Sequence, residues 1–194
     1  MTMRNSDTIR YLPFEPTHFS DVVTLGNEVQ GDNYLSVESL KTMYEKSWHN
    51  NINASLVAYH GNDIVGFRLT YAHSQWQCDK WCSPELWPVP SDKVCYFKCN
   101  TVSPRMQGVG IGSTLLAKSI EQTSKQGAMA GLAHIWLASP GNSAFKYFCK
   151  NGGQLIKKHP NKWQYESLYE GYDCPVCPNT CECEGAEMML VFNS

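Results

Sequence analysis

The stretch "NTVSPRMQGVGIGSTLLAKSI", residues 100–120, decides the fold of this 194-residue chain. It joins a strand-like run that ends at Val102 to an amphipathic helix, through a turn that contains Gly108, Gly110 and Gly112. Glycine tolerates positive φ and lets a ligand approach the backbone closely. The first amides of a helix lack internal partners and lie at the positive end of the helix dipole. The segment therefore predicts an anion-binding turn that suits a pyrophosphate.

Two other phosphate-binding loops do not fit this turn. A dinucleotide-binding turn has the spacing G-x-G-x-x-G and a later acidic residue at a strand end, whereas residues 108–112 read G-x-G-x-G. A Walker loop needs Gly-Lys-Ser/Thr, which the turn lacks. The remaining alternative is a tight strand–helix turn that binds no ligand.

Hydrophobic periodicity on both sides of the turn predicts a mixed α/β order. Strands are expected at residues 8–15, 54–60, 63–73, 94–104, 133–140, 152–159 and 187–192, and helices at 17–31, 36–50, 112–128 and 142–152. The expected helix ends are the N-caps Thr17, Ser36 and Asn142 and the stops Gly31, Gly127 and Gly152. Ser39 is expected to be only polar filler. Antiparallel hairpins and one strand–helix–strand crossover then give a mixed sheet flanked by helices.

Composition limits the class of protein. Hydrophobic residues make up 42% of the chain and charged residues 18%, which is typical of a globular protein. A length of 194 residues predicts one domain. The net charge of -2 gives no electrostatic reason to expect nucleic acid or an anionic membrane as a partner.

The ends and the cysteines of the chain indicate its compartment. Residues 1–15 lack the apolar run of a signal peptide, and no stretch approaches the roughly 20 apolar residues of a membrane span. A cytoplasmic protein is therefore expected. Nine cysteines, an odd number, then argue against a disulfide framework.

Two segments of the chain resemble motifs of the GNAT N-acetyltransferase superfamily. "VSPRMQGVGIG", residues 102–112, is similar to the family's Q/R-x-x-G-x-G/A acetyl-CoA motif, including the Val-x-Pro that precedes it. "SPGNSAFKYFCKNGG", residues 139–153, is similar to the family's N-x-x-A-x-x-x-Y-x-x-x-G segment. The likeness covers most of the chain and implies the GNAT (acyl-CoA N-acyltransferase) fold, a mixed mostly antiparallel central sheet flanked by helices. It implies one domain over residues 1–194, with a Trp- and Cys-containing loop at 74–93 and a Cys-rich loop at 170–186.

This resemblance implies transfer of an acetyl group from acetyl-CoA to an amine, a small molecule or a peptide, by direct attack in a ternary complex. The turn amides would hold the pyrophosphate, and the strand end and the next helix would hold the pantetheine arm. The implied acetyl-CoA contacts are Thr101, Val102, Gln107, Gly108, Val109, Gly110, Ile111, Gly112, Ser113, Asn142 and Phe148. A homodimer is common in the family. The alternative function is a CoA-binding sensor or regulatory module without turnover, and a zinc-dependent adaptor is disfavoured by the negative net charge.

The reaction needs a base for the amine, donors for the oxyanion and an acid for the thiolate. A backbone amide beside Val102 is expected to serve the oxyanion. The family commonly has a tyrosine four residues before the glycine that ends the helix, and here Phe148 holds that position relative to Gly152. The adjacent Tyr147 is therefore either the acid or a core residue.

The base is also open. Tyr96 stands where some family members carry a glutamate, and we expect it, or a water that it holds, to accept the amine proton. Strand alternation predicts that Tyr96, Lys98, Asn100 and Val102 share one face. The alternative bases are His134 and His73 on neighbouring strands.

The stretch "CPVCPNTCEC", residues 174–183, brings four cysteines into ten residues: Cys174, Cys177, Cys181 and Cys183. Four thiolates form a closed structural zinc site with no open coordination position, so a catalytic metal is not expected. An iron–sulfur cluster and a free or redox-labile set are alternatives. Cys78 and Cys82 are candidates to replace two of the ligands. Because this connection lies near the acceptor in the family fold, the cysteines are expected to shape the acceptor pocket.

The remaining cysteines and several aromatic residues have simpler interpretations. Cys95, Cys99 and Cys149 are expected to be buried thiols that act as small apolar residues. Four aromatic residues could line an acceptor pocket or form the core of a loop, and both interpretations stay open. They are Trp76, Trp81, Trp87 and Tyr34.

Overall fold

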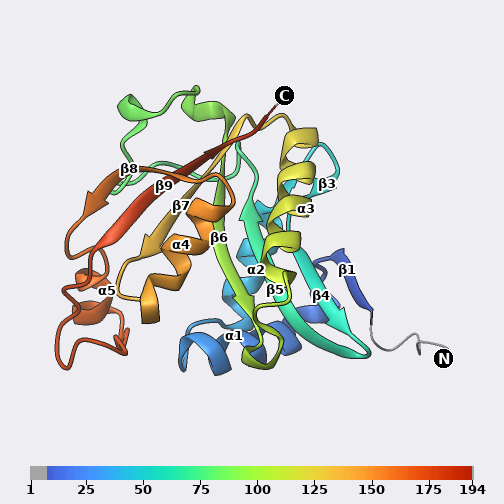
Figure 1. Ribbon diagram of the computed structural model, residues 1–194, viewed down its shortest axis with the longest axis horizontal. Coiled ribbons are helices and arrows are strands. Elements are labelled where there is room, and N and C mark those ends of the chain that lie inside the picture. Colours follow the sequence, from blue (N-terminus) through green and yellow to red (C-terminus); the bar gives the residue numbers. More distant parts are fainter. Residues whose placement is uncertain (1–7, 194) are drawn as a thin grey trace. The chain divides into compact units, whose positions relative to one another are not determined.

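The structure, a computed structural model, describes residues 8–193. The chain forms two compact units (Figure 1), the first made of residues 1–76 and 95–128 and the second of residues 77–94 and 129–194. The expected single domain over 1–194 stays a prediction. None of the helices in the described part of the chain has the length and apolar character needed to cross a membrane.

An antiparallel sheet in the order β1-β4-β5-β6 forms the middle of the first unit. Its strands are β1 (Ile9–Pro13), β4 (Leu56–His60), β5 (Asp63–Tyr71) and β6 (Val94–Val102). Gly61, at a φ of +61°, turns β4 into β5, which confirms the predicted hairpin. A second, short hairpin of β2 (Trp48–His49) and β3 (Ile52–Asn53) was not predicted.

Helices cover both faces of this sheet. They are α1 (Phe19–Gln30), α2 (Val37–Lys46) and α3 (Ile111–Gln126). Val57 belongs to the core cluster that α1 and α2 complete, whereas its neighbours Leu56 and Ala58 belong to the cluster that α3 completes. Successive strand residues point to opposite faces, so α1 and α2 cover one face and α3 covers the other.

The helix ends follow capping chemistry, with two corrections to the prediction. Ser36 caps α2 as predicted, but Ser39 is not filler, because its Oγ accepts from the Ser36 amide at 3.0 Å while Ser36 Oγ accepts from the Ser39 amide. This reciprocal pair satisfies two amides that the helix leaves unpaired. Thr17 is not the cap of α1, because a 3-10 turn, η1 (Pro16–His18), comes first and His18 takes the N-cap position.

The strands of the second unit pair antiparallel in the order β7-β9-β8. Its strands are β7 (Ala130–Trp136), β8 (Gln154–His159) and β9 (Gly185–Val191), and its helices are α4 (Ser143–Lys150) and α5 (Gln164–Tyr169). All of β9 except its last residue is buried, and the buried residues include the charged Glu187. Helix α5 lies in the connection that carries the cysteines and was not predicted.

Candidate functional site

The glycine turn after β6 has the backbone that the sequence predicts. Gly108 has a φ of +81° and Gly110 a φ of +88°, conformations that strain any residue with a Cβ. Within the described residues, no atom lies within 4 Å of the place that a Cβ would take at either glycine. The side chain of Gln107 donates from Nε2 to the carbonyl of Val102 at 3.2 Å and so braces the turn. The turn therefore exposes its backbone to open space.

Helix α3 begins directly after this turn, with Gly110 at its N-cap and 16 residues in its length. The positive end of the helix dipole thus lies at the turn. The start of α3 is packed closely on β5, since a Cβ on Gly66 would lie 3.2 Å from Ile111 Cγ2 and 3.3 Å from the Thr101 carbonyl. The absence of a side chain at Gly66 lets the helix bring its N-terminus against the end of β6. Together these features suit a bound anion.

A β-bulge divides β6 into two parts. The pairing of β5 with β6 shifts between Leu69, which lies opposite Cys99, and Thr70, which lies opposite Phe97, so Lys98 is the extra residue. Leu69 and Cys99 belong to the core cluster under α1 and α2. Thr70 Oγ1 instead forms a hydrogen bond with Ser119 Oγ of helix α3 at 2.9 Å. The two pairs therefore face opposite sides of the sheet.

The bulge overturns the predicted arrangement of the β6 side chains. Tyr96 pairs with Tyr71 and faces the side of α1 and α2, whereas Val102 belongs to the cluster under α3 and Asn100 shares its face. The prediction that Tyr96, Lys98, Asn100 and Val102 share one face is wrong, because an extra residue inverts the alternation from that point.

Tyr96 lies in an aromatic cluster of the first unit. Its ring centroid is 6.1 Å from that of Tyr71 and 5.0 Å from that of Trp76. Burial raises the pKa of Tyr71 to about 12, so this neighbour stays protonated at neutral pH. The Lys46 ammonium lies 5.1 Å from the centre of the Tyr71 ring. Trp76 thus packs beside the candidate base, on the same unit.

Two asparagines carry buried acceptors whose donors are not found among the described residues. One is Oδ1 of Asn142, which takes the N-cap position of α4 at a φ of +54° without a side-chain capping bond. The other is Oδ1 of Asn100, on β6. Buried acceptors normally have a donor, so each is a candidate to bind a ligand N–H group. The motif near residue 142 predicted the first, whereas the second was missed although it stands two residues before Val102.

The other predicted acetyl-CoA residues are placed as follows. The Thr101 side chain is buried and accepts a hydrogen bond from Gln30 at 3.3 Å. Val109 is 67% exposed at the tip of the turn. Phe148 is buried against Gly153, where any Cβ would overlap the ring, and Tyr147 beside it is half-buried.

Both alternative histidines bond to backbone carbonyls. His134 lies 2.7 Å through Nε2 from the Trp81 carbonyl, and burial lowers its pKa to about 4. Its imidazole is therefore neutral at pH 7, with the proton on Nε2, because a carbonyl can only accept. His73 lies 3.1 Å through Nε2 from the Gln126 carbonyl.

Glu187 anchors, within the second unit, the loop segment that contains Ser83 and Trp87. Its carboxylate is fully buried and accepts from the Ser83 amide at 2.8 Å, from Trp87 Nε1 at 2.8 Å and from His159 Nε2 at 2.9 Å. Burial opposes its charge, but these donors together lower its pKa. Trp87 therefore belongs to the core of the loop, and the ring of Trp81 packs against His159 at 5.7 Å.

Tyr34 and Cys99 are joined in the first unit. The hydroxyl of Tyr34, which is 41% exposed, donates to Cys99 Sγ at 3.2 Å. Cys95 and Cys99 are buried, as predicted, and burial raises the pKa of the Cys95 thiol to about 12. Cys149 is exposed, so the prediction of its burial is wrong: the residue lies on the outer face of a short amphipathic helix.

The four cysteines of the cysteine-rich loop converge. Their sulfur atoms all lie within 4.8 Å of one another, with Sγ of Cys183 at 3.7 Å from Cys174 and 3.6 Å from Cys177. Tetrahedral zinc with bonds of about 2.3 Å would separate its sulfurs by about 3.8 Å. Cys78 and Cys82 do not belong to this group of ligand atoms.

Two local contacts prepare the cysteine cluster for a cation. Burial opposes ionisation of Cys174, but hydrogen bonds from the amides of Cys177 and Val176 lower the pKa of its thiol to about 7. The Cys181 amide donates to Ser167 Oγ at 3.1 Å, which ties the loop to α5. The donor set therefore fits a closed metal site of four thiolates.

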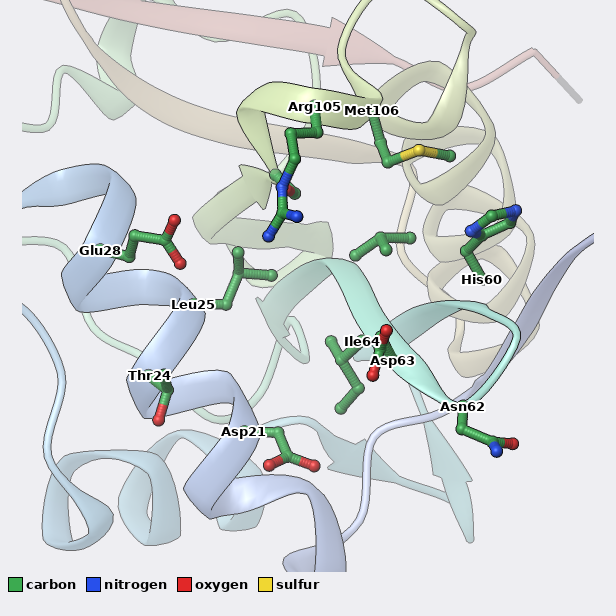
Figure 2. A pocket seen from close by; sticks show the side chains of 12 residues that line it. Asp21, Thr24, Leu25, Glu28, His60, Asn62, Asp63, Ile64, Arg105 and Met106 are labelled. Atoms are coloured by element: carbon green, nitrogen blue, oxygen red, sulfur yellow. The ribbon is translucent and has the colours of Figure 1, made fainter.

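A separate pocket of about 360 Å³ adjoins the glycine turn on the first unit (Figure 2). It lies between α1, the β4–β5 turn and the segment that precedes Gln107, and Arg105 extends into it. Its other charged walls are Asp21 and Glu28 of α1 and Asp63 of β5. None of the predicted acetyl-CoA residues lines it.

Comparison with known proteins agrees with this geometry. The sequence model of the acetyltransferase (GNAT) family matches residues 25–152, which include the glycine turn and α4. No curated protein sequence matches the chain.

Solved structures resemble the chain over nearly its whole length. Ard1 from Thermoplasma volcanium is 12% identical, with a TM-score of 0.68 over 96% of this chain and 99% of its own. Naa50 from Arabidopsis thaliana, solved with the bisubstrate analogue CoA-Ac-MVNAL, is 14% identical, with a TM-score of 0.64 over 95% and 99%. Naa20 from Chaetomium thermophilum, also with a bisubstrate analogue, is 17% identical, with a TM-score of 0.69 over 95% and 86%. At these identities the likeness establishes the fold alone.

Proposed function

This chain belongs to the acetyltransferase (GNAT) family, and from that premise we propose that it transfers the acetyl group of acetyl-CoA to a primary amine by direct attack in a ternary complex. The observation that carries the proposal is the turn between β6 and α3. It combines two glycines at positive φ, open space above the backbone and the positive end of a 16-residue helix. That combination suits the pyrophosphate of a CoA thioester.

The proposed acetyl-CoA contacts use backbone and amide groups. The turn from Gln107 to Ser113 holds the pyrophosphate, and main-chain groups at Thr101 and Val102 hold the pantetheine arm. Asn142 Oδ1, buried without a donor among the described residues, accepts an N–H group of that arm. Phe148 supports α4 through its packing on Gly153.

In the proposed chemistry the amine nitrogen attacks the thioester carbonyl and a tetrahedral oxyanion forms. A backbone amide beside Val102 stabilises the oxyanion, and Tyr96, or a water that it holds, takes the amine proton. The C–S bond then breaks and the CoA thiolate leaves, protonated by Tyr147 or by solvent. Because a thiol pKa lies around 8–9, the thiolate leaves readily near neutral pH even without an acid.

The acceptor is an amine of a small molecule or a peptide. A peptide as the acceptor is supported by the likeness in fold to Naa50, which was solved with CoA-Ac-MVNAL, an analogue that joins CoA to a peptide. A panel of amines and peptides with acetyl-CoA, followed by chromatography of released CoA, tests the proposal. Acetyl-CoA binding without CoA release for any acceptor would instead indicate a sensor without turnover.

The glycine turn offers a variant with a matched control. Gly110→Ala places a residue with a Cβ in the left-handed backbone conformation at the proposed pyrophosphate site. The substitution should raise the KM for acetyl-CoA about tenfold or more. Gly61→Ala imposes comparable strain in the β4–β5 turn, where a Cβ also meets no atom of the described residues within 4 Å. It should lower stability by about 1 kcal/mol without changing that KM. Equal effects on KM would contradict the assignment of the turn.

Tyr96→Phe tests the proposed base. Removal of the hydroxyl should lower kcat by about tenfold or more and remove one limb of the pH–rate profile. An unchanged rate and profile would remove Tyr96 from the mechanism and leave a water-borne base.

We also propose that Cys174, Cys177, Cys181 and Cys183 bind one structural Zn²⁺ without Cys78 or Cys82. The support is the convergence of four sulfurs at spacings near those of a tetrahedral site. Elemental analysis of purified protein should find one zinc per chain. Iron would indicate a cluster, and the absence of metal would indicate free thiols.

A further inference from the structure

The surface formed by α5 and the cysteine-rich loop exposes large apolar side chains. Tyr165, Leu168, Tyr169 and Val176 are exposed by 56%, 52%, 72% and 56%, respectively. These four lie within 12 residues, although only twelve large hydrophobics in the described part of the chain are exposed by 37% or more. Single exposed apolar residues are ordinary, but a concentration of them marks an interaction site. We call residues 164–184 the α5 surface.

Hydrogen bonds and ring contacts hold the α5 surface in shape. The rings of Tyr165 and Tyr169 pack with centroids 5.0 Å apart. The Tyr172 amide donates to the Glu166 carbonyl at 3.1 Å, and the Cys181 amide to Ser167 Oγ at 3.1 Å. Tyr165, Leu168 and Tyr169 are therefore presented on a helix that the loop fixes in place.

The charge of the α5 surface has one sign. It contains five acidic residues and no lysine or arginine: Glu166, Glu170, Asp173, Glu182 and Glu184. Glu184 pairs with Lys158 at 3.5 Å, and the ion pairs found among the described residues include none of the other four. Four thiolates around a divalent ion would add further negative charge beside them.

We propose that the α5 surface docks a basic segment of a partner protein that also carries apolar residues. Apolar side chains of the segment would cover Leu168 and the two tyrosines, and an arginine would stack on a tyrosine face while pairing with Glu170 or Asp173. Opposite charges would also steer the encounter. This proposal goes beyond the acetyl transfer and does not depend on it.

The negative charge of the α5 surface favours a basic segment over a second copy of the chain, nucleic acid or anionic lipid. A second copy docked through a two-fold axis would place the same acidic residues against themselves, which is repulsive. Nucleic acid and anionic lipid are repelled for the same reason. A basic segment covers the apolar side chains and neutralises the carboxylates at once.

The test uses the full chain and a synthetic probe. A fluorescent peptide of about 14 residues that alternates arginine or lysine with leucine or phenylalanine is compared with one that has glutamate at every basic position. Fluorescence anisotropy at low salt should show the basic peptide binding at least about tenfold more tightly, with affinity that falls as salt is added.

A matched pair of double variants locates the binding. Leu168→Ser with Glu170→Lys should weaken binding about tenfold or more. Leu86→Ser with Glu85→Lys is the control, since Leu86 is exposed by 53% against 52% for Leu168 and Glu85 is exposed too. The control should bind like the unaltered protein, and thermal melts verify that both variants fold.

Three outcomes would overturn the proposal. They are equal weakening in the two double variants, equal affinity for the basic and acidic peptides, and sedimentation data that show a second copy covering the α5 surface. In the last case the Leu168 and Glu170 variant would convert a dimer to a monomer.

Discussion

His134 is a buried histidine whose charged form the fold opposes. Burial lowers its pKa from an ordinary 6.5 to about 4 and outweighs the hydrogen bond to the Trp81 carbonyl, which raises that pKa. A folded-state pKa below the unfolded value means that the unfolded chain binds more protons between these two values. The contribution of His134 to stability is therefore complete above pH 6.5 and is lost as the pH falls toward 4.

This linkage predicts a measurable pH dependence. Between pH 7 and pH 5, protonation of the unfolded chain at this site should lower the free energy of unfolding by about 2 kcal/mol. His134→Gln keeps a donor for the Trp81 carbonyl and should remove that part of the dependence in urea denaturation. His60→Gln, at a partly exposed position, is the control and should retain it. Parallel pH curves for all three proteins would contradict the assignment.

Single residues show where sequence reasoning ends. Ser36, Gly110 and Gly127 could be placed from the sequence because each satisfies a purely local rule of caps and turns. The face of the sheet to which Tyr96 points could not be predicted. It is set by the bulge at Lys98, which depends on how β6 pairs with β5, a strand more than 20 residues earlier in the chain. The burial of Asn100 Oδ1, which has no donor among residues 8–193, likewise depends on the folded structure and could not be predicted.

At the scale of elements, the contact between α3 and β5 sets the position of the glycine turn. Gly66→Ala places a methyl group 3.2 Å from Ile111 Cγ2 and 3.3 Å from the Thr101 carbonyl, so the helix start must move. We expect a loss of stability of about 1–3 kcal/mol, as in other overpacked cores. Because the helix start carries the turn, the KM for acetyl-CoA should also rise. Denaturant unfolding and initial rates test both effects, and a destabilised variant with unchanged KM would show that this packing does not position the turn.

Most elements of the chain could be predicted from periodicity, and the exceptions have a physical reason. The strands and the four longer helices carry enough residues to display a period of two or of 3.6. Helix α5 spans only Gln164–Tyr169, and the β2–β3 hairpin pairs two residues on each side, so neither offers a repeat to detect. Both are held mainly by contacts that the rest of the fold supplies.

At the scale of the whole molecule, metal removal should affect the two substrates unequally. In the family fold the cysteine-bearing connection lies on the acceptor side, so a chelator should raise the KM for the amine more than that for acetyl-CoA. Cys177→Ser should reproduce this effect, whereas Cys149→Ser, at an exposed cysteine outside the cluster, should not. An equal rise in both KM values would indicate general destabilisation instead.

The family and the backbone of the glycine turn were readable from the sequence because both depend on a short, contiguous motif. The acceptor was not readable, because its recognition depends on side chains from distant segments. Trp87 shows the limit: an aromatic residue that seemed available for a substrate instead donates a hydrogen bond to Glu187, 100 residues later.

The bulge at Lys98 has a consequence for how substitutions will be tolerated along β6. A regular strand accepts polar replacements at every second position, in one unbroken phase. In β6 the alternation of faces is interrupted once, at Lys98. Tyr96 and Cys99 face the side of α1 and α2, while Phe97 and Val102 face the side of α3. A saturation scan of β6 should therefore show two short periodic patterns offset by one residue. Deletion of Lys98 itself should be tolerated, because the loss of the extra residue restores a regular alternation in which Phe97 and Cys99 keep their opposite faces.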